Sequence, residues 1–169
     1  LVPLAPMTNI ALFARTHPES FARLGRIVFM GGGAMVSNAT ASAEFNVFHD
    51  PEATALVLDA AVEHDVPVTM YGLDVFYAPT VTATQGRELT ALDSAIGRLA
   101  GGIIDFACRR FGSDTATIGD AGAVAAVLAP SLVRTQQLPV RVELSGTWTR
   151  GRTIVDLRES AMDMNHDPH

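Results

Sequence analysis

The hydrophobic pattern of the chain alternates between short apolar runs and longer helical periods. Residues 27–30 and 66–71 are uncharged and rich in β-branched or aromatic side chains, which is typical of buried strands. Between them, from Pro51 to about His64, apolar residues recur at helical spacing. A strand–helix–strand order with short connections favours a parallel, right-handed crossover. We therefore predict an α/β fold: an open, mostly parallel, Rossmann-like sheet flanked by helices.

The same pattern predicts further elements on both sides of this unit. Residues 1–6 read as the end of a strand, and residues 84–111 carry the longest helical period in the chain. Asp120 is placed to cap a helix over residues 121–128. Two alternating segments, 140–144 and 153–157, predict a C-terminal β-hairpin. We expect one partial domain over residues 1–159 and a disordered tail over residues 160–169, which has no apolar period.

Composition narrows the functional classes. The 169 residues are 48% apolar, which suits one folded core, and a net charge of −6 gives no reason to expect nucleic acid as a partner. No apolar run approaches the roughly 20 residues that cross a membrane. The single Cys108 fits a reducing, cytoplasmic compartment. Because the chain starts at Leu1 inside an apolar run, we expect it to be a piece of a longer protein.

The chemistry is concentrated in the loop that follows the first strand. Three glycines, 31–33, lead into a polar segment in which Asn38, Glu44 and Asn46 surround Phe45. Open α/β sheets bind ligands at the carboxyl ends of their strands, and amide and carboxylate groups suit the hydroxyls of a sugar. A tight turn and a solvated carboxylate are the simpler alternatives. The glycine spacing does not match the dinucleotide-binding fingerprint, and no lysine makes a phosphate loop.

Several motifs together resemble the inosine–uridine-preferring nucleoside hydrolase family. The central ones are Met30-Gly31-Gly32-Gly33, Ala43-Glu44-Phe45-Asn46 and Asp50-Pro51-Glu52-Ala53. The resemblance continues over residues 6–11, 72–75, 120–125 and 139–146, and so spans nearly the whole chain. It implies hydrolysis of the N-glycosidic bond of ribonucleosides to ribose and free base, by water activated on a bound calcium ion (Ca²⁺).

The resemblance also implies roles for individual residues. Asp120 would bind calcium and a ribose hydroxyl, and the main-chain carbonyl of Leu4 would be a second calcium ligand. Asn38 and Glu44 would hold the 5′-hydroxyl end of the ribose. The remaining contacts would come from Asn46 at the 2′ and 3′ hydroxyls, Met30 beneath the sugar and Phe45 at the wall of the site.

Two departures from the family pattern bear on activity. The family's Asp-x-Asp-x-x-x-Asp-Asp motif, which carries the other calcium ligands and the catalytic base, is absent and would precede Leu1. Gly119 stands where many members have a histidine that protonates the leaving base, and Tyr77 is the remaining candidate donor. A non-catalytic remnant, acting as a ribose-binding or oligomerisation module, is therefore the alternative. The sequence leaves the oligomeric state open, a homo-oligomer included.

Overall fold

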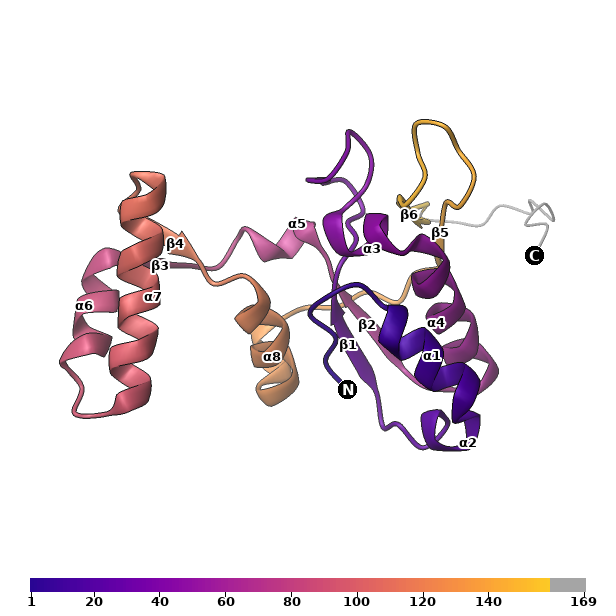
Figure 1. The fold of residues 1–169 in the computed structure, drawn as a ribbon, viewed down its shortest axis with the longest axis horizontal. Helices are drawn as coiled ribbons and strands as arrows, with labels where there is room; N and C mark the ends of the chain where they lie inside the picture. The colour runs from indigo at the N-terminus through magenta and orange to yellow at the C-terminus, as the bar shows by residue number, and fades with distance from the viewer. Residues whose placement is uncertain (159–169) are drawn as a thin grey trace.

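The computed structural model describes residues 1–158, so the tail predicted over residues 160–169 lies outside the described residues. Helices and strands are interspersed along the described chain, and a hairpin of two helices projects from the rest of the molecule on a narrow connection (Figure 1). The helices are α1 (Thr8–Thr16), α2 (Pro18–Phe21), α3 (Phe45–His49), α4 (Pro51–Glu63), α5 (Leu73–Phe76), α6 (Ala83–Ala91), α7 (Ala95–Phe111), α8 (Asp120–Leu128) and the 3₁₀ turn η1 (Pro130–Leu132). The strands are β1 (Ile27–Met30), β2 (Val68–Tyr71), β3 (Thr80–Thr82), β4 (Thr115–Thr117), β5 (Val140–Val142) and β6 (Thr153–Val155).

The parallel pairing predicted between the first two strands is confirmed. β1 and β2 pair in parallel, with Ile27 opposite Val68 and Met30 opposite Tyr71. On the other side of β1, residues 1–3 run alongside it: the Val28 and Met30 amides donate to the carbonyls of Leu1 and Pro3 at 3.0 and 2.9 Å. This register is that of a parallel neighbour, because both partners advance together along the chain.

The expectation of a mostly parallel sheet is wrong for the described residues. Their strands form three separate two-stranded sheets, and the β3–β4 and β5–β6 pairs are antiparallel. The β5–β6 pair is the predicted C-terminal hairpin, which is therefore confirmed. The β3–β4 pair, which the sequence did not predict, has only three residues per strand, too short to produce a strong alternating pattern.

Helices cover both faces of β1. Ile27 and Phe29 point to one face and are buried with residues of α1, α2 and α4, including Phe21 and Val57. Met30 points to the opposite face, where a second buried cluster also contains Tyr71, Leu73 of α5, and Ala123 and Ala126 of α8. At the start of α4, the Asp50 carboxylate accepts from the Ala53 amide at 3.0 Å, so the predicted cap and the proline at the first helical position are confirmed.

The single long helix predicted over residues 84–111 is wrong, because the chain turns back on itself at residues 92–94. Leu92 is extended, and the Ser94 hydroxyl accepts from the Gly97 amide to start α7 as a new helix. The two helices pack closely through glycines: a Cβ on Gly101 would lie 2.4 Å from the carbonyl oxygen of Gly86. Apolar periodicity continues across the break, and that is why periodicity alone predicted one helix.

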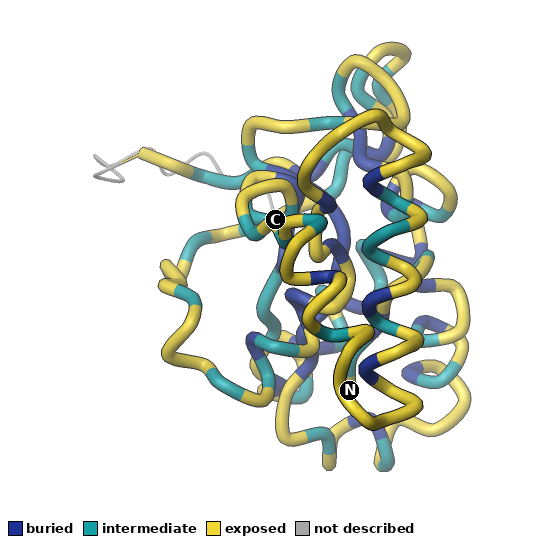
Figure 2. Tube along the Cα trace, turned by 90° about the vertical axis from the view of Figure 1, so that its left-hand side faces the viewer, coloured by how far each residue is buried: buried dark blue, intermediate teal, exposed yellow. Residues whose placement is uncertain are grey.

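Exposed residues predominate along α6 and α7, with buried positions only at intervals (Figure 2). The buried positions of α7 are Gly97, Gly101 and Cys108. Within residues 1–158, no helix combines the length and the apolarity required to span a bilayer.

Candidate functional site

The Gly31–Gly33 loop at the carboxyl end of β1 is held from within by Glu44. This carboxylate is only 3% exposed. Its Oε2 accepts from the amides of Gly32 at 2.9 Å and Val47 at 3.1 Å, and its Oε1 accepts from the Asn46 amide at 2.9 Å. Glu44 thus caps α3 and ties that helix to the glycine loop. Three of its roughly four acceptor positions are used by these amides, which leaves one on Oε1.

Two residues that the sequence did not single out as site residues fix the other side of the loop. The Asp74 carboxylate accepts from the amides of Ala34 at 2.6 Å and Met35 at 2.8 Å. The buried Thr153 hydroxyl accepts from the Gly33 amide at 2.9 Å and donates to its carbonyl at 2.7 Å. Asp74 follows the end of β2, the edge where ligands bind in such sheets, and that position was the available signal. Thr153 lies 120 residues from Gly33 and gave none.

Gly32 must be a glycine in this arrangement. Its φ of +68° lies in the left-handed region, and a Cβ there would stand 2.7 Å from Cγ2 of Thr153 and 2.9 Å from Sδ of Met70. The backbone therefore approaches β2 and the C-terminal hairpin at the same point. This close approach is compatible with both interpretations of the three glycines, a tight turn and a loop that binds a ligand.

Most of the predicted ribose-binding residues lie at the end of β1, in the loop that follows it and at the start of α3, whereas Asp120 lies on α8. The side-chain Nδ2 of Asn46 donates to the Met30 carbonyl at 3.1 Å and lies 3.4 Å from Sδ of Met30, so these two residues are in contact. The Asn38 side-chain oxygen accepts from the Phe45 amide at 2.9 Å, so the loop closes on the start of α3. Phe45 is half exposed and its ring lies 4.0 Å from that of His49.

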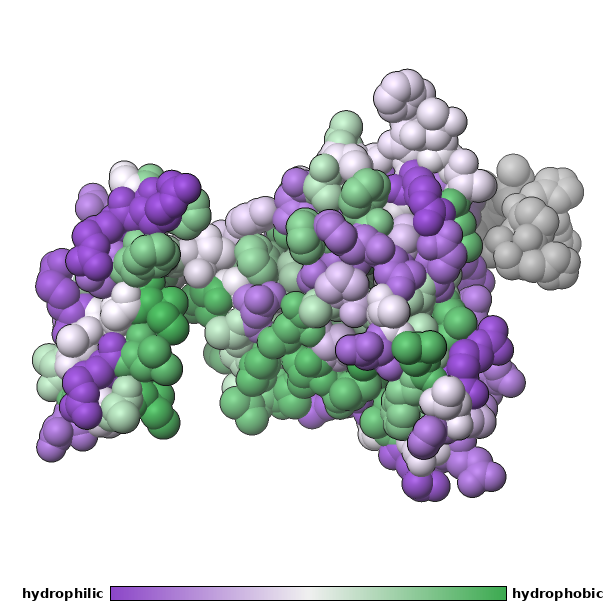
Figure 3. Space-filling view, viewed as in Figure 1, coloured by the Kyte–Doolittle hydropathy of each residue, from purple (hydrophilic) through white to green (hydrophobic). Residues whose placement is uncertain are grey.

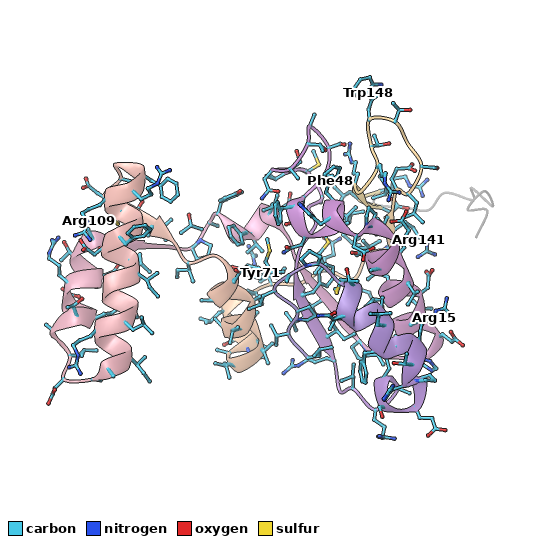
Figure 4. The ribbon with its side chains drawn as sticks, viewed as in Figure 1. Arg15, Phe48, Tyr71, Arg109, Arg141 and Trp148 are labelled. Carbon is cyan, nitrogen blue, oxygen red and sulfur yellow. The ribbon has the colours of Figure 1, made fainter. Side chains whose placement is uncertain are left out.

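Asp120 begins α8 but does not cap it. The cap position is Gly119, with φ +62°, and no side chain bonds there. The Asp120 side chain is exposed, one turn before Ala123 in the cluster that also contains Met30. Gly122 packs against Tyr71, because a Cβ added at Gly122 would lie 2.0 Å from the Tyr71 hydroxyl. Helix α8 is therefore fixed against the end of β2 beside Tyr71 (Figure 4). Burial raises the pKa of Tyr71.

Gly119, where the family resemblance would place a histidine, is confined by an aromatic ring. A Cβ on Gly119 would lie 3.0 Å from Cζ of Phe76. The neighbouring Tyr77 is half exposed, and its ring meets that of Phe76 edge-on with the centroids 5.1 Å apart.

A complete calcium site is not present within residues 1–158, where no three His, Cys, Asp or Glu side chains gather in a metal-binding arrangement. Calcium takes six to eight oxygen ligands. Asp120 and the carbonyl of Leu4 would supply a carboxylate and a carbonyl ligand. These are fewer ligands than calcium takes, so the described donor set does not fit the ion by itself.

The hairpin loop between β5 and β6 docks on the helices next to the site. Arg150 forms a two-point ion pair with Glu52 of α4 at 2.7 and 2.8 Å, and its guanidinium also donates to the Leu144 carbonyl. The hydrogen bond from Arg150 lowers the pKa of Glu52. A Cβ on Gly151 would lie 2.9 Å from the Phe48 backbone, so this loop also touches α3.

Comparison with known proteins gives a consistent result. The family model described as inosine-uridine preferring nucleoside hydrolase matches residues 1–168. The pyrimidine-specific ribonucleoside hydrolase RihA of Shewanella woodyi is 38% identical over 161 residues, covering 92% of this chain and 50% of its own length. The inosine-uridine preferring nucleoside hydrolase of Crithidia fasciculata is 35% identical, covering 98% and 53%.

A solved structure agrees. The purine-preferring ribonucleoside hydrolase of Gardnerella vaginalis superposes with a TM-score of 0.80 at 33% identity, covering 92% of this chain and 50% of that one. The chain thus spans about half the length of the relatives it matches. With a family model matched from residue 1 to residue 168, this chain belongs to the inosine–uridine-preferring nucleoside hydrolase family.

Proposed function

We propose that this chain supplies the ribose-facing part of a ribonucleoside hydrolase, an enzyme that cleaves the N-glycosidic bond to give ribose and free base. The observation that carries the proposal is the family match over residues 1–168. The internally anchored loop between β1 and α3 supports it, because a binding loop that is already ordered loses less entropy when its ligand arrives.

The side chains of this loop offer the groups that a sugar requires. The Asn46 amide nitrogen is turned toward Met30, and its side-chain oxygen accepts no hydrogen bond from another residue among 1–158, so it can accept from the 2′ and 3′ hydroxyls. The free acceptor position on Glu44 Oε1 suits the 5′-hydroxyl. Met30 would pack beneath the ribose, with Asn38 and Phe45 beside it.

Hydrolysis itself needs more than these residues. Cleavage builds positive charge on the sugar and requires an activated water, and a bound calcium ion would supply it by lowering the water pKa. Asp120 and the Leu4 carbonyl are the proposed ligands from this chain. The remaining ligands and the base would come from polypeptide outside the described residues, so we assign no hydrolytic step to residues 1–158. The base preference stays open, since the relatives named above differ in theirs.

A second candidate is a non-catalytic ribose-binding or oligomerisation module of the same family. Two observations favour it: Gly119 has no side chain that could give a proton to a leaving base, and no metal-binding group of three side chains is gathered within residues 1–158.

The two candidates differ in turnover. The test uses two forms: this chain, and a longer form extended upstream of Leu1 in the same reading frame. Each is incubated with calcium and with inosine or uridine, and the release of free base and reducing sugar is measured. We expect release by the longer form only, and its loss in the longer form's Asp120→Ala variant. No release by either form would reject the hydrolase proposal and favour the binding module.

A further inference from the structure

Helix α7 presents an apolar stripe to solvent. Ile96, Leu99, Ile103 and Phe106 follow one another at spacings of three, four and three residues, so they lie on one side of the helix. Their exposed fractions run from 60 to 81%. Four large side chains in one continuous row are more than the scattered apolar residues of an ordinary surface.

This stripe is not the seam of the helical hairpin. The seam is formed by Gly97, Gly101 and Cys108, which are buried, and by Gly86 of α6, where a Cβ would lie 2.8 Å from the Ile104 side chain. Because α6 already occupies that side of α7, the exposed row needs a different partner.

A second apolar face lies opposite. Helix α8 packs Ala123 and Ala126 against the β1–β2 sheet, while Val124 and Leu128 on α8 and Leu132 on η1 are exposed. Figure 3 shows hydrophobic residues on both sides of the open space that separates the helical hairpin from the rest of the molecule. In Figure 1, α7 and α8 border this space.

The sheet has an open edge as well. Residues 1–3 bond to β1 through the carbonyls of Leu1 and Pro3, and in an extended segment the intervening groups face the other way. No hydrogen bond to another residue within 1–158 engages the backbone amides of Val2 or Leu4. Such an edge accepts a further strand.

The relatives indicate what fills these surfaces. The Gardnerella vaginalis structure has the same fold with a TM-score of 0.80, yet this chain covers only 50% of it. As much polypeptide again therefore belongs to one nucleoside hydrolase fold. We propose that the apolar faces of α7 and α8 bind a polypeptide equivalent to the half of the nucleoside hydrolase fold that this chain does not match.

The test measures association and needs neither substrate nor metal, so it can fail independently of the proposed hydrolase function. The probe is the part of the Shewanella woodyi enzyme that lies outside its match to this chain, and the matched part of the same enzyme is the positive control. Light scattering after size exclusion should show a one-to-one complex of the probe with this chain. Leu99→Glu combined with Ile103→Glu should weaken binding at least tenfold, whereas Ile103→Val should not.

The matched control is Val62→Glu on α4, which adds the same charge at a position that is 79% exposed and lies outside the two faces; it should leave binding unchanged. Circular dichroism confirms that each variant is folded. The proposal is overturned if the double variant still binds the probe, or if the chain stays monomeric with the probe present. It is equally overturned if the chain ignores the probe and pairs with a second copy through the same stripe.

Discussion

Replacing Glu44 tests whether its carboxylate organises the loop that we propose to face the ribose. In the Ala variant, the buried amides of Gly32 and Val47 and the partly buried amide of Asn46 lose their acceptor. A hydrogen bond to a charged group contributes about 1.5–3 kcal/mol, and the loss of a helix cap alone costs about 1 kcal/mol. Allowing for water reaching some of these amides, we expect Glu44→Ala to lower the free energy of unfolding by about 4 kcal/mol.

The Gln variant gives a graded response. Glutamine keeps one oxygen, which can still serve the Gly32 and Val47 amides, but it sets an amino group against the Asn46 amide. One lost bond and one donor–donor contact predict a cost of about 2 kcal/mol. The control Glu63→Gln changes the same group at an exposed position of α4 and should stay within about 0.5 kcal/mol of the parent.

Urea unfolding followed by circular dichroism measures these differences at pH 7, and hydrogen exchange of the Gly32 amide reports the loop directly. The Gly32 amide should exchange much faster in Glu44→Ala than in the parent. If Glu44→Ala costs less than about 1 kcal/mol, or if the Gly32 amide keeps its protection, the carboxylate is not what holds the loop.

Three other perturbations test neighbouring parts of the structure. Gly119→His should destabilise the chain by about 1–2 kcal/mol in urea unfolding instead of restoring a proton donor, because φ is +62° and Phe76 fills the space of a Cβ; unchanged stability would show that Phe76 moves aside. The lowered pKa of Glu52 means that its pairing with Arg150 favours the folded state above the ordinary pKa of 4.5 and is lost as pH falls through the lower folded value. The protection factors of the amides of residues 144–151, which correct for the intrinsic pH dependence of exchange, should then fall in acid, and an Arg150→Met variant should lack this change. Gly101→Ala should cost about 2 kcal/mol, because its Cβ would press on the Gly86 carbonyl at 2.4 Å; a Gly102→Ala control, which has open space, should not destabilise in the same assay.

Local chemistry explains which parts of the fold the sequence could predict. The Asp50–Pro51 start of α4, the parallel β1–β2 pair and the C-terminal hairpin each have a signal within a few residues. The break between α6 and α7 also had one, since Ser94 is a typical cap residue, but the apolar period running through it dominated the interpretation. Two of the contacts that organise the candidate site had no such local signal for their partners. Asp74 reaches Ala34 across 40 residues and Thr153 reaches Gly33 across 120, and one sequence without an alignment carries no trace of such pairs.

The anchored loop and the proposed metal site differ in how complete they are within residues 1–158. Three side chains within residues 1–158 fix the backbone of residues 31–35 or its junction with α3: Glu44, which caps α3, Asp74 on α5 and Thr153 on β6. The proposed metal site is different, because its carboxylates are not gathered within the same residues. The backbone of the proposed sugar-binding loop is thus fixed within the described residues, while the carboxylates of the proposed metal site are not gathered there. If the proposed function holds, we expect this chain to retain contacts to the sugar, and we expect the activation of water to require ligands from outside residues 1–158.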